Sequence, residues 1–163
     1  MPKKYNMKIN RIGYLLMLVM FFSACTKLEY NQQFSSTFPI SGDWTIKVND
    51  GTTTTGPFFI KIYNTSFSKD SVWIDDNGTF WTIKAKAKVD MKNLTFSAVN
   101  AENEYYTSQV NFANGKVIGK DSIYFEAVFS DELATDGQTP APYATTFKFS
   151  GHRKVSYEEY MGL

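Results

Sequence analysis

From Ile40 onward, apolar and polar residues alternate with a period of two, and this alternation constrains the fold more than any other feature of the chain. In the clearest run, 81–89, a Trp, an Ile, two Ala and a Val share one face, while a Thr and three lysines share the other. Successive side chains of a β-strand point to opposite faces, so the pattern predicts strands with one buried face. Aromatic residues make up 17% of the chain, which also suits strands better than helices.

Similar runs recur along the chain and predict eight or nine strands. They lie at 44–48, 58–62, 94–98, 106–112, 123–129 and 143–149, with shorter pieces at 72–75 and 116–119. Asp76-Asn77-Gly78 and Asn114-Gly115 are typical of tight hairpin turns, and 90–93 and 100–103 of four-residue turns, so neighbouring strands are expected to pair antiparallel. Short connections favour an all-β, up-and-down barrel, whose closure removes exposed sheet edges. A two-sheet sandwich is the alternative.

The N-terminal segment has the features of a secretory signal. Residues 1–11 contain four basic and no acidic residues, and the apolar run 12–22 that follows is too short to span a bilayer, which takes about 20 residues. Residues 22–25, Phe-Ser-Ala-Cys, resemble the bacterial lipobox, in which the cysteine becomes the first mature residue and carries the lipid. The resemblance implies a signal peptide at 1–24 and acylation of Cys25, the only cysteine in the chain. The alternative is a signal peptide followed by an unmodified thiol.

Without the signal, 13 basic residues face 16 acidic ones, a balance that argues against binding nucleic acid through a basic surface. Residues 26–38 are rich in Asn, Gln, Ser and Thr and show no apolar periodicity. We therefore expect a lipidated N-terminus and flexible tether at 25–38, and a barrel domain at 39–163.

Two short motifs mark the ends of the predicted barrel. Gly42-Asp43-Trp44 begins the first strand and resembles the G-x-W motif of the calycin superfamily, which includes lipocalins and fatty-acid-binding proteins. Gly151-His152-Arg153 closes the last strand. The resemblance implies that Trp44 plugs one end of the barrel and that Arg153 lies across its ring in a cation–π contact. The other interpretation is a core tryptophan and an unrelated surface arginine.

Over residues 40–160 the chain resembles a narrower family, the bacterial lipoproteins described as lipid-binding putative hydrolases, which are assigned a calycin-like barrel. The segments that carry the resemblance are Ser41–Trp44, Tyr63–Thr65, Val72–Asp76, Asp121–Ile123, Gly151–Arg153 and Glu158–Tyr160. It implies a β-barrel with an apolar ligand, and it identifies no catalytic residue.

The residues themselves favour a protein that is not an enzyme. His152 is the only imidazole available as a general base, and no G-x-S-x-G motif occurs. The adjacent carboxylates Asp75 and Asp76 open a turn and lack the spacing of a calcium loop. We expect no catalytic residue, no metal and no cofactor. Ser156 and Glu159 fit a capping box, which predicts a short C-terminal helical turn.

The predicted inward faces supply the candidates for a ligand site. Seven residues are the ligand-lining candidates: Phe58, Ile60, Trp81, Ile83, Phe96, Phe125 and Phe147. They can either fill the barrel as a solid core or line a cavity for an acyl chain, and the sequence leaves both open. The lysines at 84, 86 and 88 are expected on the solvated outer face.

Taken together, these patterns predict a membrane-anchored lipoprotein of the bacterial cell envelope, in the outer membrane, with a calycin-like barrel that binds a lipid or another small hydrophobic ligand. The alternative function is a surface-interaction module that binds glycan or protein and holds no internal ligand. Its contacts would be exposed aromatics such as Tyr63, Trp73, Tyr105 and Tyr124.

Overall fold

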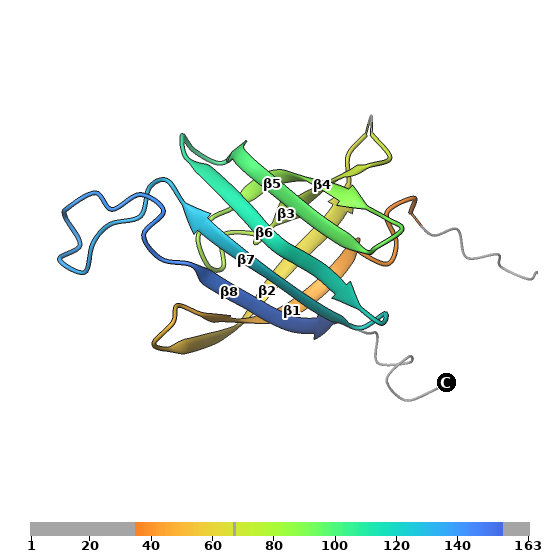
Figure 1. The fold of residues 1–163 in the computed structure, drawn as a ribbon, viewed down its shortest axis with the longest axis horizontal. Helices are drawn as coiled ribbons and strands as arrows, with labels where there is room; N and C mark the ends of the chain where they lie inside the picture. The colour runs from red at the N-terminus through yellow and green to blue at the C-terminus, as the bar shows by residue number, and fades with distance from the viewer. Residues whose placement is uncertain (1–34, 67, 155–163) are drawn as a thin grey trace, which may run out of the picture. The chain divides into compact units, whose positions relative to one another are not determined.

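The computed structural model describes residues 35–66 and 68–154, which form a single closed antiparallel barrel in which each strand pairs with the next and β8 pairs with β1 (Figure 1). The strands are β1 (Gly42–Asn49), β2 (Thr54–Asn64), β3 (Ser71–Asp75), β4 (Lys84–Asp90), β5 (Thr95–Glu102), β6 (Gln109–Ile118), β7 (Ser122–Phe129) and β8 (Phe147–Arg153). The prediction of an all-β, up-and-down barrel is confirmed, with eight strands, and the sandwich is excluded. The predicted signal, Cys25 and the C-terminal helical turn lie outside the described residues.

The alternation in sequence matches the burial of the strands. In β7, Ile123, Phe125, Ala127 and Phe129 are all buried and point into the barrel. In β4, Ala85 and Ala87 are buried, Lys86 and Lys88 are exposed and Lys84 is half-buried, so the prediction of an outer lysine face is confirmed for Lys86 and Lys88. The described residues contain no helix long and apolar enough to cross a membrane.

Two predicted turns are wrong. Asn114 and Gly115 lie within β6, where its pairing with β7 shifts register, and Asn114 takes a left-handed φ of 54°. A Cβ on Gly115 would lie 2.4 Å from the carbonyl oxygen of Phe96, so only glycine fits there. The actual β6–β7 turn is 119–121, and the β5–β6 turn is 103–108 instead of 100–103.

The antiparallel order places the connections at two ends of the barrel. The end that contains the start of β1, the end of β8 and the turns 65–70, 91–94 and 119–121 is called the terminal end here. The opposite end, called the loop end, contains the connections 50–53, 76–83, 103–108 and 130–146. Figure 1 shows the long β7–β8 connection at the loop end, on the left.

Residues 35–40, placed by the sequence within or next to the tether, form a turn against the terminal end. Thr37 and Ile40 are fully buried there. The compact part of the chain therefore begins before the predicted domain boundary at residue 39.

Candidate functional site: the aromatic interior and its two ends

The terminal end is closed by Trp44. Its side chain is buried, and its indole N–H donates a hydrogen bond of 3.2 Å to the carbonyl of Ile40. The guanidinium carbon of Arg153 lies 4.3 Å from the centroid of the Trp44 ring, at cation–π distance. Arg153 also donates to the carbonyls of Ser41 (2.9 Å), Lys120 (3.0 Å) and Pro39.

The glycine two residues before Trp44 has a steric role in this closure. A Cβ on Gly42 would lie 1.9 Å from Nη1 of Arg153, and its φ of 149° is one that other residues rarely adopt. Gly42 therefore leaves the space in which the guanidinium reaches across the tryptophan.

Phenylalanine rings in contact with one another run through the interior. The rings of Phe125 and Phe149 stack with centroids 4.4 Å apart, and Phe96 and Phe112 lie 5.6 and 5.9 Å from Phe125. Phe80 continues the cluster toward the loop end, with its ring 5.4 Å from that of Phe149. At such separations aromatic side chains are packed against one another, so the protein's own side chains occupy this part of the barrel.

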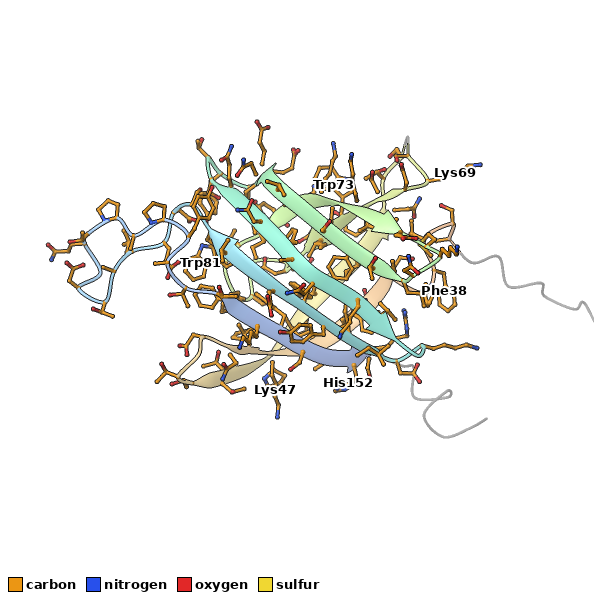
Figure 2. All side chains as sticks on the ribbon, in the orientation of Figure 1. Phe38, Lys47, Lys69, Trp73, Trp81 and His152 are labelled. Atoms are coloured by element: carbon orange, nitrogen blue, oxygen red, sulfur yellow. The ribbon has the colours of Figure 1, made fainter. Side chains whose placement is uncertain are left out.

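A plug formed by Phe80 and Trp81 covers the loop end. Phe80 lies within 6.4 Å of Phe58, Phe129 and Phe147, and Trp81 stacks on Phe129 at 4.5 Å with ring planes 7° apart. Both plug residues are half-buried and belong to the β3–β4 connection, 76–83. Figure 2 shows Trp81 at this end, next to the start of the β7–β8 connection.

The carboxylate of Asp76 organises the connection that carries the plug. This side chain is 1% exposed and accepts five backbone N–H groups. The donors belong to Gly78, Phe80, Trp81, Thr82 and Ile83, at 2.7–3.1 Å. Hydrogen bonds to an ionised acceptor are strong, so Asp76 fixes the backbone of the plug.

A second carboxylate holds the plug from the side. The indole N–H of Trp81 lies 3.2 and 3.3 Å from the two oxygens of Asp131, at the start of the β7–β8 connection. The Tyr106 hydroxyl donates to the same carboxylate at 2.6 Å. Three loop-end connections therefore meet at Asp131.

Carboxylates at the loop end also raise the pKa values of nearby tyrosines. Burial, followed by the negative charge of Asp75 and a hydrogen bond of 3.2 Å to it, raises the pKa of Tyr63 to about 12. Burial and then the hydrogen bond to Asp131 raise the pKa of Tyr106 to about 12. Burial, followed by the hydrogen bond of 3.0 Å that its hydroxyl donates to Asp75, raises the pKa of Tyr105.

A spectrophotometric titration tests this arrangement. The native protein will keep Tyr63 and Tyr106 protonated above the ordinary tyrosine pKa of about 10, and they will ionise near 12. A pKa raised by folding contributes stability that is present below about pH 10 and is lost as the pH rises through the native value. Tyr106→Phe should remove one late-ionising group from the absorbance titration. A curve in which all tyrosines of the folded protein ionise near pH 10 would contradict the rim geometry.

The seven predicted ligand-lining residues fall into two groups. Ile60, Ile83, Phe96 and Phe125 are buried in the core. Phe58, Trp81 and Phe147 are half-buried at the loop end, where Trp81 lies 5.2 Å from Phe147. Trp81 lies in the connection before β4, and not in the strand that the alternation predicted.

The sequence missed the centre of this aromatic cluster. Phe80 lies outside the alternating pattern, which therefore predicts no face for it, although it contacts five other rings. The alternation predicts strands that contain Phe112, Phe129 and Phe149, but it does not distinguish these three rings as site residues. One signal in the sequence could have identified Phe80. Two adjacent aromatics, Phe80 and Trp81, directly follow a turn, and large aromatics at such a place indicate burial against the barrel.

The only histidine lies away from the aromatic interior. His152 is exposed on the outer wall, opposite Ser122 of β7 and Thr45 of β1 in the strand register. Among the described residues no hydrogen bond joins its imidazole to either hydroxyl, and no three metal-ligating side chains cluster. Both oxygens of Asp75 and of Asp76 already accept hydrogen bonds from protein donors.

The comparison with protein families matches residues 29–158 to the family model described as lipid-binding putative hydrolase. The match covers all eight strands. The chain therefore belongs to this lipid-binding family, and its fold is an eight-stranded barrel. A search of curated proteins found no match.

Proposed function

We propose that this chain is a lipid-anchored protein of the bacterial cell envelope, with a calycin-like barrel that binds a lipid or another small hydrophobic molecule. The observation that carries the binding proposal is the match of residues 29–158 to a lipid-binding family, and the half-buried aromatic rings at the loop end add apolar surface beside the packed core. Together with membership of a lipid-binding family, this apolar surface favours a ligand with a hydrocarbon chain. Burial of that chain would stabilise the complex by about 25 cal/mol per Å² of apolar area, less the costs of association.

The contacts at the terminal end support the calycin-like assignment. Gly42, Trp44 and Arg153 lie together as the G-x-W resemblance implies, on the first and last strands of a barrel. The lipid anchor is supported by the sequence around Cys25 alone.

Uptake of cis-parinaric acid, a fatty acid that fluoresces when it is taken out of water, tests the binding proposal. We expect saturable binding that natural lipids displace. Fluorescence no higher than that of an unrelated β-barrel control at equal concentration would reject it.

Replacing the cysteine tests the anchor. Cys25→Ser removes the thiol that receives the acyl chains, and each buried CH₂ of such a chain contributes about 0.8 kcal/mol to membrane binding. We expect the variant to move from the detergent phase to the aqueous phase in a phase-partition experiment, whereas the unmodified chain stays with detergent. Continued detergent partitioning of Cys25→Ser would contradict the anchor.

One observation favours a surface-interaction module as the second candidate. Tyr63 and Trp73 are cross-strand neighbours on β2 and β3, and Tyr105 shares the Asp75 carboxylate with Tyr63. These three aromatics gather on the outer wall, as a glycan or protein contact would require. Tyr124, the fourth residue predicted for this role, lies on β7 with its hydroxyl bonded to Glu126. Glycan-array binding that is lost in Trp73→Ala would favour this function.

A further inference from the structure

The barrel wall is incomplete between β4 and β5. Their ladder has three pairs, the last at Lys88 and Ser97. The strands reconnect near the loop end, where the Lys84 N–H donates to the Asn103 side chain at 3.0 Å and the Lys84 carbonyl accepts from the Glu104 N–H at 2.9 Å. Between these two connections, residues 84–88 of β4 face the longer stretch 97–104, which runs from β5 into the β5–β6 connection. Because it contains more residues, the stretch 97–104 bows away from β4.

The cause of the bow lies in β5 itself. Its pairing with β6 shifts register twice, between Phe96 and Ala98 and again between Ala98 and Ala101. Within the second shift Asn100 takes a left-handed φ of 50°, and its N–H donates to the Asn111 side chain at 2.5 Å. Val99, next to it, is 80% exposed. A bulge of this kind bends the strand and interrupts its ladder.

The bow leaves a groove of about 600 Å³ in the outer wall, called the β4–β5 groove here. Three small apolar residues line it, Ala87, Ala98 and Ala101; Ala87 belongs to the buried core, and the other two are partly buried and pack against that core. Alanine side chains leave space where larger ones would close the wall. A volume of this size lies in the ordinary range for small-molecule sites, about 300–1,000 Å³.

Cationic side chains border the groove on the β4 side. Lys86 and Lys88 are exposed, and the Lys86 ammonium lies 4.5 Å from the centroid of Trp73, which also lines the groove. The carboxylates that line it, Glu102 and Glu104, lie toward the loop end, beyond the alanines. The groove thus has a basic part beside the Lys88–Ser97 pair and an apolar part next to it.

A second hollow extends this surface. It measures about 700 Å³, shares Lys88 and Ser97 with the groove, and continues past Lys116 to Tyr124. The Lys116 ammonium lies 5.7 Å from the Tyr124 ring, so another cation borders the extension. The carboxylate that lines this second hollow belongs to Asp90.

The loop end offers a poorer route for an anionic ligand. The connections 50–53, 76–83, 103–108 and 130–146 contain six acidic residues and no basic residue. An anion there meets like charge, which opposes association. The plug of Phe80 and Trp81 is also fixed by the hydrogen bonds to Asp76.

We infer that the β4–β5 groove binds a fatty acid, with the carboxylate at Lys86 and Lys88 and the hydrocarbon chain over Ala98, Val99 and Ala101. This inference rests on the proposed function and names its ligand class and its site. The lysines supply opposite charge to the head group, and Ala98, Val99 and Ala101 supply an apolar surface for the chain.

Photolabelling of the full chain tests the inference. The probe is a palmitic acid analogue that carries a diazirine and an alkyne, and the labelled peptides are identified by mass spectrometry. We expect label in 86–88 and 97–102, displaced by palmitate better than by hexadecanol or hexadecyltrimethylammonium. The variant Lys86→Glu/Lys88→Glu should lower labelling about tenfold, because two attractive charges become repulsive.

The matched control is Lys47→Glu/Lys148→Glu, which makes the same charge change at two exposed lysines of β1 and β8. Figure 2 shows Lys47 on the side of the barrel opposite Trp73. This variant should label like the unmodified chain. Ala98→Trp, which fills the groove, should lower labelling while Lys86 and Lys88 are retained.

The outcomes separate the inference from the proposed function. Label on Phe80, Trp81 or Phe147 that is insensitive to Lys86→Glu/Lys88→Glu would overturn the groove and leave lipid binding standing. An equal loss of label in Lys86→Glu/Lys88→Glu and in Lys47→Glu/Lys148→Glu would also overturn it, since the change in the net charge of the protein would then explain the effect. Labelling no stronger than that of an unrelated control protein would overturn both.

Discussion

Trp44→Ala will lower the free energy of unfolding by about 3–5 kcal/mol, the usual range for truncation of a buried tryptophan. Trp44 is 1% exposed, and the variant loses its packing, its hydrogen bond to Ile40 and the ring beneath Arg153. Denaturant unfolding followed by circular dichroism measures the change. The effect is expected to be large because the strands around Trp44 are held in a closed barrel and cannot collapse into the cavity that its truncation leaves.

Trp73→Ala provides the matched control. Trp73 is half-buried on the outer wall, beneath the Lys84 and Lys86 ammonium groups. Its truncation leaves no enclosed cavity, so the loss of stability should be clearly smaller than for Trp44→Ala. Equal losses in the two variants, or a loss below about 1 kcal/mol for Trp44→Ala, would mean that Trp44 does not close the barrel.

Asp76→Ala is the second substitution with a large expected effect, about 3–4 kcal/mol of stability. It leaves five backbone N–H groups of the plug without their acceptor, and each buried donor that water does not reach costs about 1–3 kcal/mol. Trp81 should become more exposed as the connection 76–83 loosens. Unfolding measurements and quenching of tryptophan fluorescence by acrylamide report the two effects.

Asp136→Ala is the control for this substitution. Asp136 also organises a loop, since its carboxylate accepts the N–H groups of Gln138 and Thr139 and the Thr139 hydroxyl, but it is exposed. Water replaces the carboxylate there, so the expected loss of stability is much smaller than for Asp76→Ala. If Asp76→Ala were no more harmful than Asp136→Ala, the plug would not depend on the buried carboxylate.

Asp76→Ala also separates entry of a ligand past the plug from binding in the β4–β5 groove of the outer wall. A loosened plug in Asp76→Ala opens the loop end but leaves the β4–β5 groove unchanged. Faster uptake of cis-parinaric acid by this variant would favour access past Phe80 and Trp81. An unchanged rate would favour the groove.

The sequence predicted the barrel because period-two alternation reports burial directly. In β7 each apolar residue of the alternating set is buried, and in β4 Lys86 and Lys88 are exposed as expected. The G-x-W motif and the terminal Gly151-His152-Arg153 led to the pairing of Trp44 with Arg153, which lie 4.3 Å apart. The alternation is a local pattern that a single sequence displays, whereas the pairing of Trp44 with Arg153 was implied by the resemblance to the calycin superfamily.

Other features depend on contacts that the pattern does not encode. Asn-Gly at 114–115 favours positive φ, which serves a bulge as well as a hairpin turn, and here it forms a bulge. The plug depends on Asp76, whose side chain binds the backbone up to seven residues further along. The β4–β5 groove follows from the conformation of Asn100, and nothing in its sequence neighbours indicates where the ladder breaks.

The filled interior changes what lipid binding requires of this barrel. Ring contacts extend from Phe96 and Phe112 to Phe80 and Trp81, so a chain that entered the centre would have to displace side chains. Binding at the wall avoids that cost, since the groove of about 600 Å³ is already present. The family's lipid-binding description and the packed core are therefore compatible.

Native mass spectrometry of the chain purified from a lipid-rich host tests the central claim, lipid binding, most directly. The account predicts a mass increase that corresponds to a fatty acid or another lipid at near one per chain, lost on solvent extraction and identified in the extract. A clean mass of the protein alone, together with failure to take up cis-parinaric acid, would contradict lipid binding and favour the surface-interaction module.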